Sequence, residues 1–79
     1  MLLIEDITPV QNSDCGCYEE QCLIFPFDVV LHLEPDGTGD AFFDSGDYYF
    51  EENFPAKNIE ELRSAAVARV WQIYEKETP

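Results

Sequence analysis

The stretch that decides the fold is residues 27–51, FDVVLHLEPDGTGDAFFDSGDYYFE. An alternating apolar and polar run, 27–34, precedes Pro35-Asp36-Gly37, and a second apolar run, 41–43, follows it. Alternation of period two is typical of a strand with one buried face. Pro-Asp-Gly is typical of a tight turn, because Pro presets φ and Gly tolerates a positive φ. The stretch therefore predicts a β-hairpin.

The length of each turn predicts which residues face each other. A three-residue loop pairs Glu34 with Thr38, which keeps the apolar residues together on one face. The resulting pairs are Leu31–Ala41 and Val29–Phe43 on the buried face, with His32–Asp40 and Val30–Phe42 on the outer face. For the next turn, a two-residue loop at Ser45-Gly46 places Tyr48 and Phe50 on the buried face, opposite Phe43 and Ala41. The same register sets Asp40 opposite Glu51 and Asp44 opposite Asp47, while the first hairpin sets Asp28 opposite Asp44.

The C-terminal part changes to a helical period. Asn58 is a good N-cap and Glu61 occupies the N3 position of a capping box. An apolar stripe with three- and four-residue spacing follows, made of Ile59, Leu62, Ala65, Ala66, Val70, Ile73 and Tyr74. This pattern predicts a helix from about Ile59 to Glu75.

Together these elements predict a single α+β domain over residues 1–79. The N-terminal Leu2–Val10 is expected to add a strand or an extended edge, and Asn12–Gln21 to form a polar loop. The expected architecture is a three- or four-stranded antiparallel sheet, a β-meander, with one C-terminal α-helix packed on its apolar face. An exposed edge strand leaves a homodimer through strand pairing as an alternative.

Charge is distributed very unevenly. The chain has a net charge of −13, from 17 acidic and 4 basic residues. Residues 1–56, the mostly β region, contain 13 of the 17 acidic residues and no Lys or Arg. Residues 57–79 contain four acidic and four basic residues and are charge-neutral. Such a charge disfavours direct binding to nucleic acid or to an anionic membrane and favours a basic partner. No segment has the length and apolar character of a signal peptide or a membrane span, so a soluble, cytoplasmic protein is expected.

The outer face of the sheet is the predicted partner-binding site. Carboxylates there would provide electrostatic attraction, and Phe42 and Tyr49 would serve as aromatic anchors. The predicted residues are Asp28, Glu34, Asp40, Phe42, Asp44, Asp47, Tyr49 and Glu51. An alternative is an acidic surface that serves only solubility.

In size and charge the chain resembles small DNA-mimicking inhibitors, such as phage anti-restriction, anti-CRISPR and uracil-DNA-glycosylase inhibitor proteins. The resemblance is one of class, without a shared motif, and it assigns no role to any single residue. It implies an inhibitor that occupies the basic groove of a nucleic-acid-handling protein. An antitoxin-like or adaptor module that binds a basic partner is the second interpretation.

The sequence offers little for catalysis and one weak hint of a metal. The chain has a single histidine, no glycine-rich phosphate loop and no nucleophile motif, so we expect no enzyme activity and no cofactor. Three close cysteines form a Cys-x-Cys-x4-Cys pattern, and reduced thiols are the expected state. A small zinc-stabilised domain that uses Cys15, Cys17, Cys22 and His32 is the remaining alternative.

Overall fold

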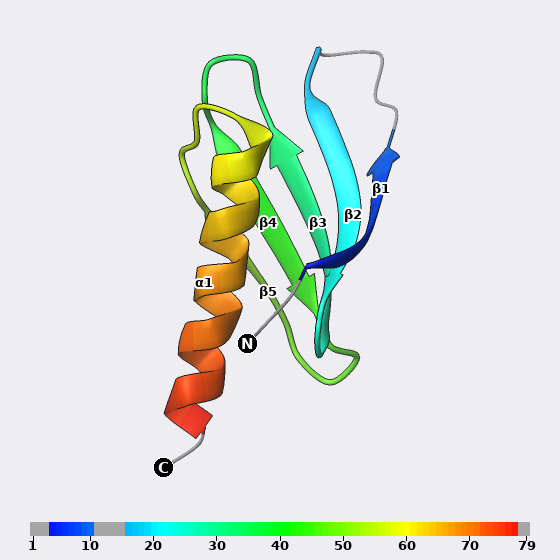
Figure 1. The fold of residues 1–79 in the computed structure, drawn as a ribbon, viewed down its shortest axis with the longest axis vertical. Coiled ribbons are helices and arrows are strands. Elements are labelled where there is room, and N and C mark those ends of the chain that lie inside the picture. Colours follow the sequence, from blue (N-terminus) through cyan, green and yellow to red (C-terminus); the bar gives the residue numbers. More distant parts are fainter. Residues whose placement is uncertain (1–3, 11–15, 78–79) are drawn as a thin grey trace.

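The computed structural model of the chain describes residues 4–10 and 16–77. In this part of the chain five strands form one antiparallel sheet in chain order, and a single helix follows them. The elements are β1 (Glu5–Val10), β2 (Tyr18–Ile24), β3 (Phe27–Leu33), β4 (Gly39–Asp44), β5 (Tyr49–Asn53) and α1 (Ile59–Glu77). Helix α1 runs along one face of the sheet (Figure 1). The α+β class, the meander order and the C-terminal helix are confirmed, but the sheet has five strands rather than three or four.

The additional strand is β2, which begins inside the segment expected to be a polar loop. Residues Tyr18–Gln21 look polar in sequence, yet Glu20 points to the buried face and its side chain is fully enclosed. A buried carboxylate hides the period-two pattern, because alternation is recognised by apolar residues on the inner face. The expectation of a loop was therefore wrong for Tyr18–Gln21, and residues 11–15 lie outside the described part.

The register between β3 and β4 is confirmed at all four predicted pairs. The backbone N–H of Glu34 donates to the carbonyl of Thr38 at 2.8 Å, which closes the three-residue loop. The Asp36 carboxylate accepts a hydrogen bond from the Thr38 N–H at 2.9 Å, and Gly37 has φ of 92°. The turn residues thus act as their chemistry predicts.

The register between β4 and β5 differs from the prediction by two residues. Phe43 faces Phe50, Asp44 faces Tyr49 and Asp40 faces Asn53. The loop is Gly46-Asp47, with the Ser45 N–H donating to the Tyr48 carbonyl at 3.0 Å and Gly46 at φ of 94°. This register lets the Phe43 and Phe50 rings stack at 4.6 Å, and it leaves Tyr48 exposed instead of buried. Because the shift is even, Tyr49, Phe50 and Glu51 keep their predicted faces, whereas Asp47 moves into the turn.

The core lies between the inner face of the sheet and α1. Its buried members are Cys22, Ile24, Phe27, Val29, Leu31, Ala41, Phe43, Ala56, Leu62, Ala66 and Val70. The last three are the centre of the predicted helical stripe, whereas Tyr74 at its end is exposed. At the start of α1, Asn58 Oδ1 accepts a hydrogen bond from the Glu61 N–H at 2.9 Å, so the predicted N-cap is confirmed.

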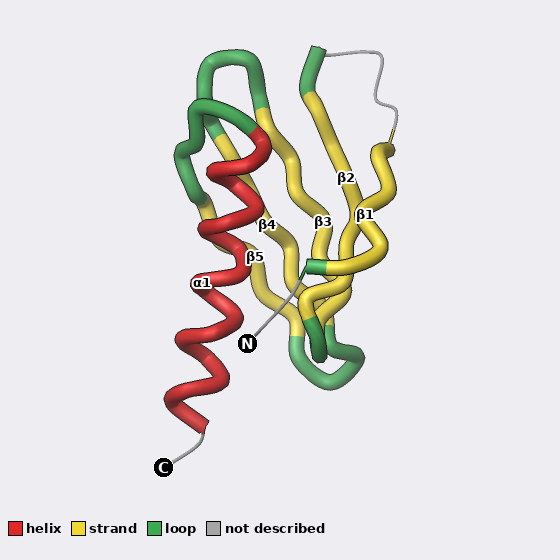
Figure 2. Tube along the Cα trace, in the orientation of Figure 1, coloured by secondary structure: helices red, strands yellow, loops and turns green. Residues whose placement is uncertain are grey.

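The short connecting loops lie at the two ends of the strands (Figure 2). At one edge, β1 is interrupted by an irregularity between Glu5 and Thr8, where Asp6 has φ of 52°. This bend allows Ile4 to pack against the core. Within the described residues, no helix has the length and apolar character that crossing a membrane requires.

Candidate functional site

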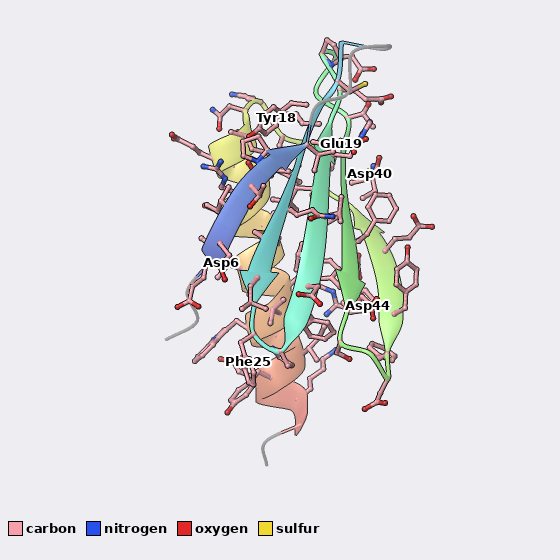
Figure 3. The ribbon with its side chains drawn as sticks, turned by 90° about the vertical axis from the view of Figure 1, so that its right-hand side faces the viewer. Asp6, Tyr18, Glu19, Phe25, Asp40 and Asp44 are labelled. Carbon is pink, nitrogen blue, oxygen red and sulfur yellow. The ribbon has the colours of Figure 1, made fainter. Side chains whose placement is uncertain are left out.

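The side of the sheet opposite α1 is the candidate site, and we call the outward side chains of β2–β5 the acidic face. Three cross-strand rows make up this face: Leu23–Asp28–Asp44–Tyr49, Gln21–Val30–Phe42–Glu51 and Glu19–His32–Asp40–Asn53. The middle row has a half-buried apolar centre, Val30 and Phe42. Acids lie in the rows on both sides of it. Glu19 and Asp40 lie towards one end of the sheet and Asp44 towards the other (Figure 3).

The structure brings most of the predicted site residues together. Six of the eight lie on the acidic face: Asp28, Asp40, Phe42, Asp44, Tyr49 and Glu51. Glu34 follows the end of β3, and Asp47 lies in the turn between β4 and β5. The like-charged pair Asp28–Asp44 is confirmed.

The other two like-charged pairs were wrong, because the β4–β5 register shifts by two. Glu51 faces Phe42, and the Asn53 amide donates a hydrogen bond to Asp40 at 3.1 Å. Tyr49 is 63% exposed, while Phe42 is half-buried. Of the two proposed anchors, Tyr49 is therefore the more accessible ring.

Positive charge is collected on the helix side. Arg63 binds Glu20, and Arg69 donates to Glu52 at 2.8 Å while its guanidinium lies 5.6 Å from the centre of the Phe50 ring. Lys57 precedes α1 and Lys76 lies in its last turn. On the acidic face, His32 is the one titratable base among the described residues, and its Nδ1 lies 2.9 Å from Glu19 Oε1. All four Lys and Arg residues thus lie on the helix side, and none lies on the acidic face.

Sequence reasoning missed the Glu20 cluster beneath the helix. Arg63 donates to both carboxylate oxygens of Glu20 at 2.7 Å, and the Tyr18 hydroxyl donates to Oε1 at 2.8 Å. Burial pushes the pKa of Glu20 upward, but the hydrogen bonds from Arg63 and Tyr18 outweigh it and leave that pKa below its ordinary value. The hydrogen bond to Glu20 raises the pKa of Tyr18 and that of Arg63. No local sequence pattern indicates this cluster, because Glu20 and Arg63 lie 43 positions apart in the chain.

The structure does not bring together all the residues of the alternative zinc set, although Cys17 and His32 lie close to each other. Cys22 is buried on the helix side of the sheet, whereas His32 lies on the acidic face. Burial raises the pKa of the Cys22 thiol to about 11, which keeps it protonated at neutral pH. Cys15 lies outside the described residues. The prediction that joined Cys22 and His32 in one site was therefore wrong, because residues of opposite parity on paired strands point to opposite faces.

An apolar groove of about 310 Å³ lies at the end of the sheet where β2 turns into β3. Its walls come from the turn residues Phe25 and Tyr48, and from Ile73 and Tyr74 of α1. Phe25 is 72% exposed, and Trp71 stacks on Tyr74 nearby with ring centres 6.3 Å apart. Its residues come from three separate segments, so no local pattern in the sequence indicates this groove.

Comparisons of the chain with protein-family models, with curated proteins and with solved structures found no match. The acidic face is therefore the basis for proposing a function.

Proposed function

We propose that the protein binds a basic protein through its acidic face and inhibits it by occupying its nucleic-acid-binding groove. The observation that carries the proposal is that the acidic face has carboxylates and no Lys or Arg. Five carboxylates lie on one side of the sheet, those of Glu19, Asp28, Asp40, Asp44 and Glu51, while the four Lys and Arg residues lie in or beside α1. A surface that serves only solubility normally mixes both signs.

The carboxylates form a grid across neighbouring strands of the sheet. Neighbouring strands lie about 4.8 Å apart, and side chains two residues apart on one strand are separated by about 7 Å. Double-stranded DNA presents one negative charge per about 1.7 Å of its axis, and proteins that bind it supply Lys and Arg to match. A grid of carboxylates offers such a basic groove an alternative set of anions. Asp28 and Asp44 face each other directly, so a cation placed between them would relieve their repulsion.

The apolar centre of the face supplies the second element of an interface. Val30 and Phe42 form a half-buried patch between the acidic rows, with Tyr49 at the β5 edge. Interfaces typically combine an apolar centre with a polar rim, and aromatic residues often dominate their binding energy. The carboxylates would speed encounter with the partner, and the rings would slow its release. The proposed role is binding rather than catalysis, in the cytoplasm where nucleic-acid-handling proteins act.

The test is affinity capture from the source cells or their host with stepwise salt elution. We expect a nucleic-acid-binding protein that is released by salt and by added double-stranded DNA or RNA. The purified partner is then titrated with the variant Asp40→Lys/Glu51→Lys, which should bind at least tenfold more weakly. The matched control, Glu60→Lys/Glu75→Lys, makes the same charge change on exposed positions of α1 and should bind normally. Equal loss in both variants, or none in either, would remove the acidic face as the site.

Competition with nucleic acid separates this proposal from the antitoxin-like or adaptor interpretation. A partner that is bound through its nucleic-acid groove is released by DNA or RNA at constant ionic strength. A partner bound elsewhere stays on the protein, and this result would favour the adaptor.

A further inference from the structure

Three residues with metal-binding side chains meet where β2 begins and β3 ends. One ligand atom each from Cys17, His32 and Glu34 lies within 4.8 Å of the other two, and all three residues are half-buried. The strand register explains why they meet. Tyr18 pairs with Leu33, so Cys17, one residue earlier, lies beside Glu34, one residue later. His32 lies on the same face as Glu34, because it is two residues earlier along the chain.

A fourth side chain orients the histidine. Glu19 faces His32 across the two strands, and its Oε1 lies 2.9 Å from Nδ1 of the ring. In metal sites a ligating histidine commonly donates its second ring N–H to a carboxylate, which fixes the ring and makes the free nitrogen a stronger donor. With Nδ1 engaged by Glu19, Nε2 is the nitrogen available to a metal ion.

From this arrangement we infer that Cys17, His32 and Glu34 bind a divalent transition-metal ion, for which zinc fits the ligand set best. Thiolate, imidazole and carboxylate are all established zinc ligands, and zinc accepts three protein ligands with water in the fourth position. Ligand atoms around a tetrahedral zinc ion stand about 3.5 Å apart, given metal–ligand distances of about 2.0–2.3 Å. The three ligand atoms lie within 4.8 Å of one another, so each pair needs to close by at most about 1.3 Å to reach this spacing.

Metal binding at this site releases one proton. The Cys17 thiol gives up its proton to solvent when its sulfur bonds to the metal, and the neutral imidazole and ionised carboxylate bind without further proton loss. Thiolate and carboxylate together neutralise the two charges of the ion. The surrounding acidic face raises the local concentration of cations. The bound ion would link the ends of β2 and β3.

This site differs from the one that the cysteine pattern suggests. Cys22, which belongs to that pattern, lies buried on the opposite side of the sheet. Glu34 takes its place as a ligand, because it continues β3 on the same side as His32. Cys22 therefore provides a matched control, because it is a cysteine of the same strand region that points to the opposite face and cannot reach the metal.

The experiment is a cobalt titration of the full chain, freed of metal with chelator and kept reduced. We expect one equivalent of Co²⁺ to produce a near-ultraviolet charge-transfer band from a thiolate ligand, with release of one proton, and zinc to displace the cobalt. Cys17→Ser should abolish the band. His32→Gln and Glu34→Gln should each weaken binding at least tenfold, and Glu19→Gln should weaken it about 10–100-fold.

The controls decide between this site and other uses of the cysteines. Cys22→Ala and Cys15→Ser should retain the band, and circular dichroism of each metal-free variant reports whether its fold is intact. Zinc should raise the melting temperature of the native protein but not that of Cys17→Ser. Absence of the band from the native protein would overturn the assignment and leave His32 and Glu19 as a hydrogen-bonded pair only. Loss of the band in folded Cys22→Ala or Cys15→Ser would overturn it as well.

Discussion

Arg63 of α1 holds Glu20 of β2 through two hydrogen bonds of 2.7 Å each, and the Glu20 side chain is 0% exposed. This pair connects the helix to a strand next to the sheet edge. The Tyr18 hydroxyl supplies a third hydrogen bond, and among the described residues no buried side-chain N or O atom lacks a partner. A fully enclosed carboxylate is tolerated only when its charge and its lone pairs are satisfied in this way.

The first prediction concerns the removal of one partner. Arg63→Met should destabilise the protein by about 3–5 kcal/mol, because it leaves an uncompensated buried carboxylate. Urea unfolding measures the loss. Lys57→Met, which removes an exposed cation next to the same helix, should change stability by less than about 0.5 kcal/mol. The double variant Glu20→Leu/Arg63→Met should recover most of the loss, since an apolar pair can replace a buried ion pair. Equal effects of Arg63→Met and Lys57→Met would show that the pair contributes no net stability.

The second prediction follows from the pKa of Glu20. This pKa is lower in the folded protein than in the unfolded chain, so its contribution to stability is present above the unfolded pKa and is lost as pH falls through the folded pKa. The stability difference between the native protein and Glu20→Gln should therefore be largest near neutral pH and shrink on acidification below about pH 4. Thermal unfolding of both proteins from pH 7 to pH 3 measures it. A pH-independent difference would mean that Glu20 titrates normally.

The third prediction concerns the like-charged pair on the acidic face. Asp28→Asn should stabilise the protein by about 0.2–1 kcal/mol, because it removes repulsion from Asp44 directly opposite. Asp44→Asn should have a similar effect, and the double variant should gain little more than either single one. Denaturant unfolding at low salt provides this double-mutant cycle, and high salt should reduce all three gains. Strictly additive gains would show that the two carboxylates do not interact.

The fourth prediction concerns Gly39 at the start of β4. A Cβ atom there would lie 2.3 Å from the Phe54 carbonyl oxygen and 3.1 Å from a Leu62 methyl group. That backbone is held in place, since the Phe54 N–H donates to the Gly39 carbonyl at 2.8 Å. Gly39→Ala should therefore cost about 2–3 kcal/mol through overpacking. Ser64→Ala on the exposed side of α1 is the control, with an expected change below about 0.5 kcal/mol. If Gly39→Ala is as stable as the native protein, the backbone at Phe54 can move away from the new methyl group at little cost in free energy.

Local patterns predicted the elements whose inner faces are apolar. In β3 and β4 the alternation and the Pro35-Asp36-Gly37 turn act together, so the pairing of Val29 with Phe43 followed directly. In α1, the apolar spacing and Asn58 predicted both the helix and its cap. The register of β5 was missed because a two-residue loop at Ser45-Gly46 and one at Gly46-Asp47 give Phe50 the same face, and the stacking of Phe43 on Phe50 selects the second.

The acidic face was predictable for the same reason, since parity along a strand decides which side a residue takes. Asp28, Asp40 and Asp44 needed only the first hairpin to be placed on it. The Glu20–Arg63 pair was not predictable, and of the Cys17–His32–Glu34 cluster the sequence suggested Cys17 and His32 but not Glu34. Each depends on β2, whose buried glutamate masks the strand pattern, and on neighbours distant in the sequence.

The sequence by itself determined the charge, the α+β class, the hairpin of β3 and β4, and the capped helix, because these follow from composition and from interactions among residues close along the chain. Only the tertiary structure decided that Glu20 is a core residue, that Cys22 and His32 face opposite ways, and that the cations lie apart from the acidic face. Those outcomes depend on which elements pack together. A carboxylate such as that of Glu20 can be buried only when the fold places a cation beside it, here Arg63 from a distant part of the chain.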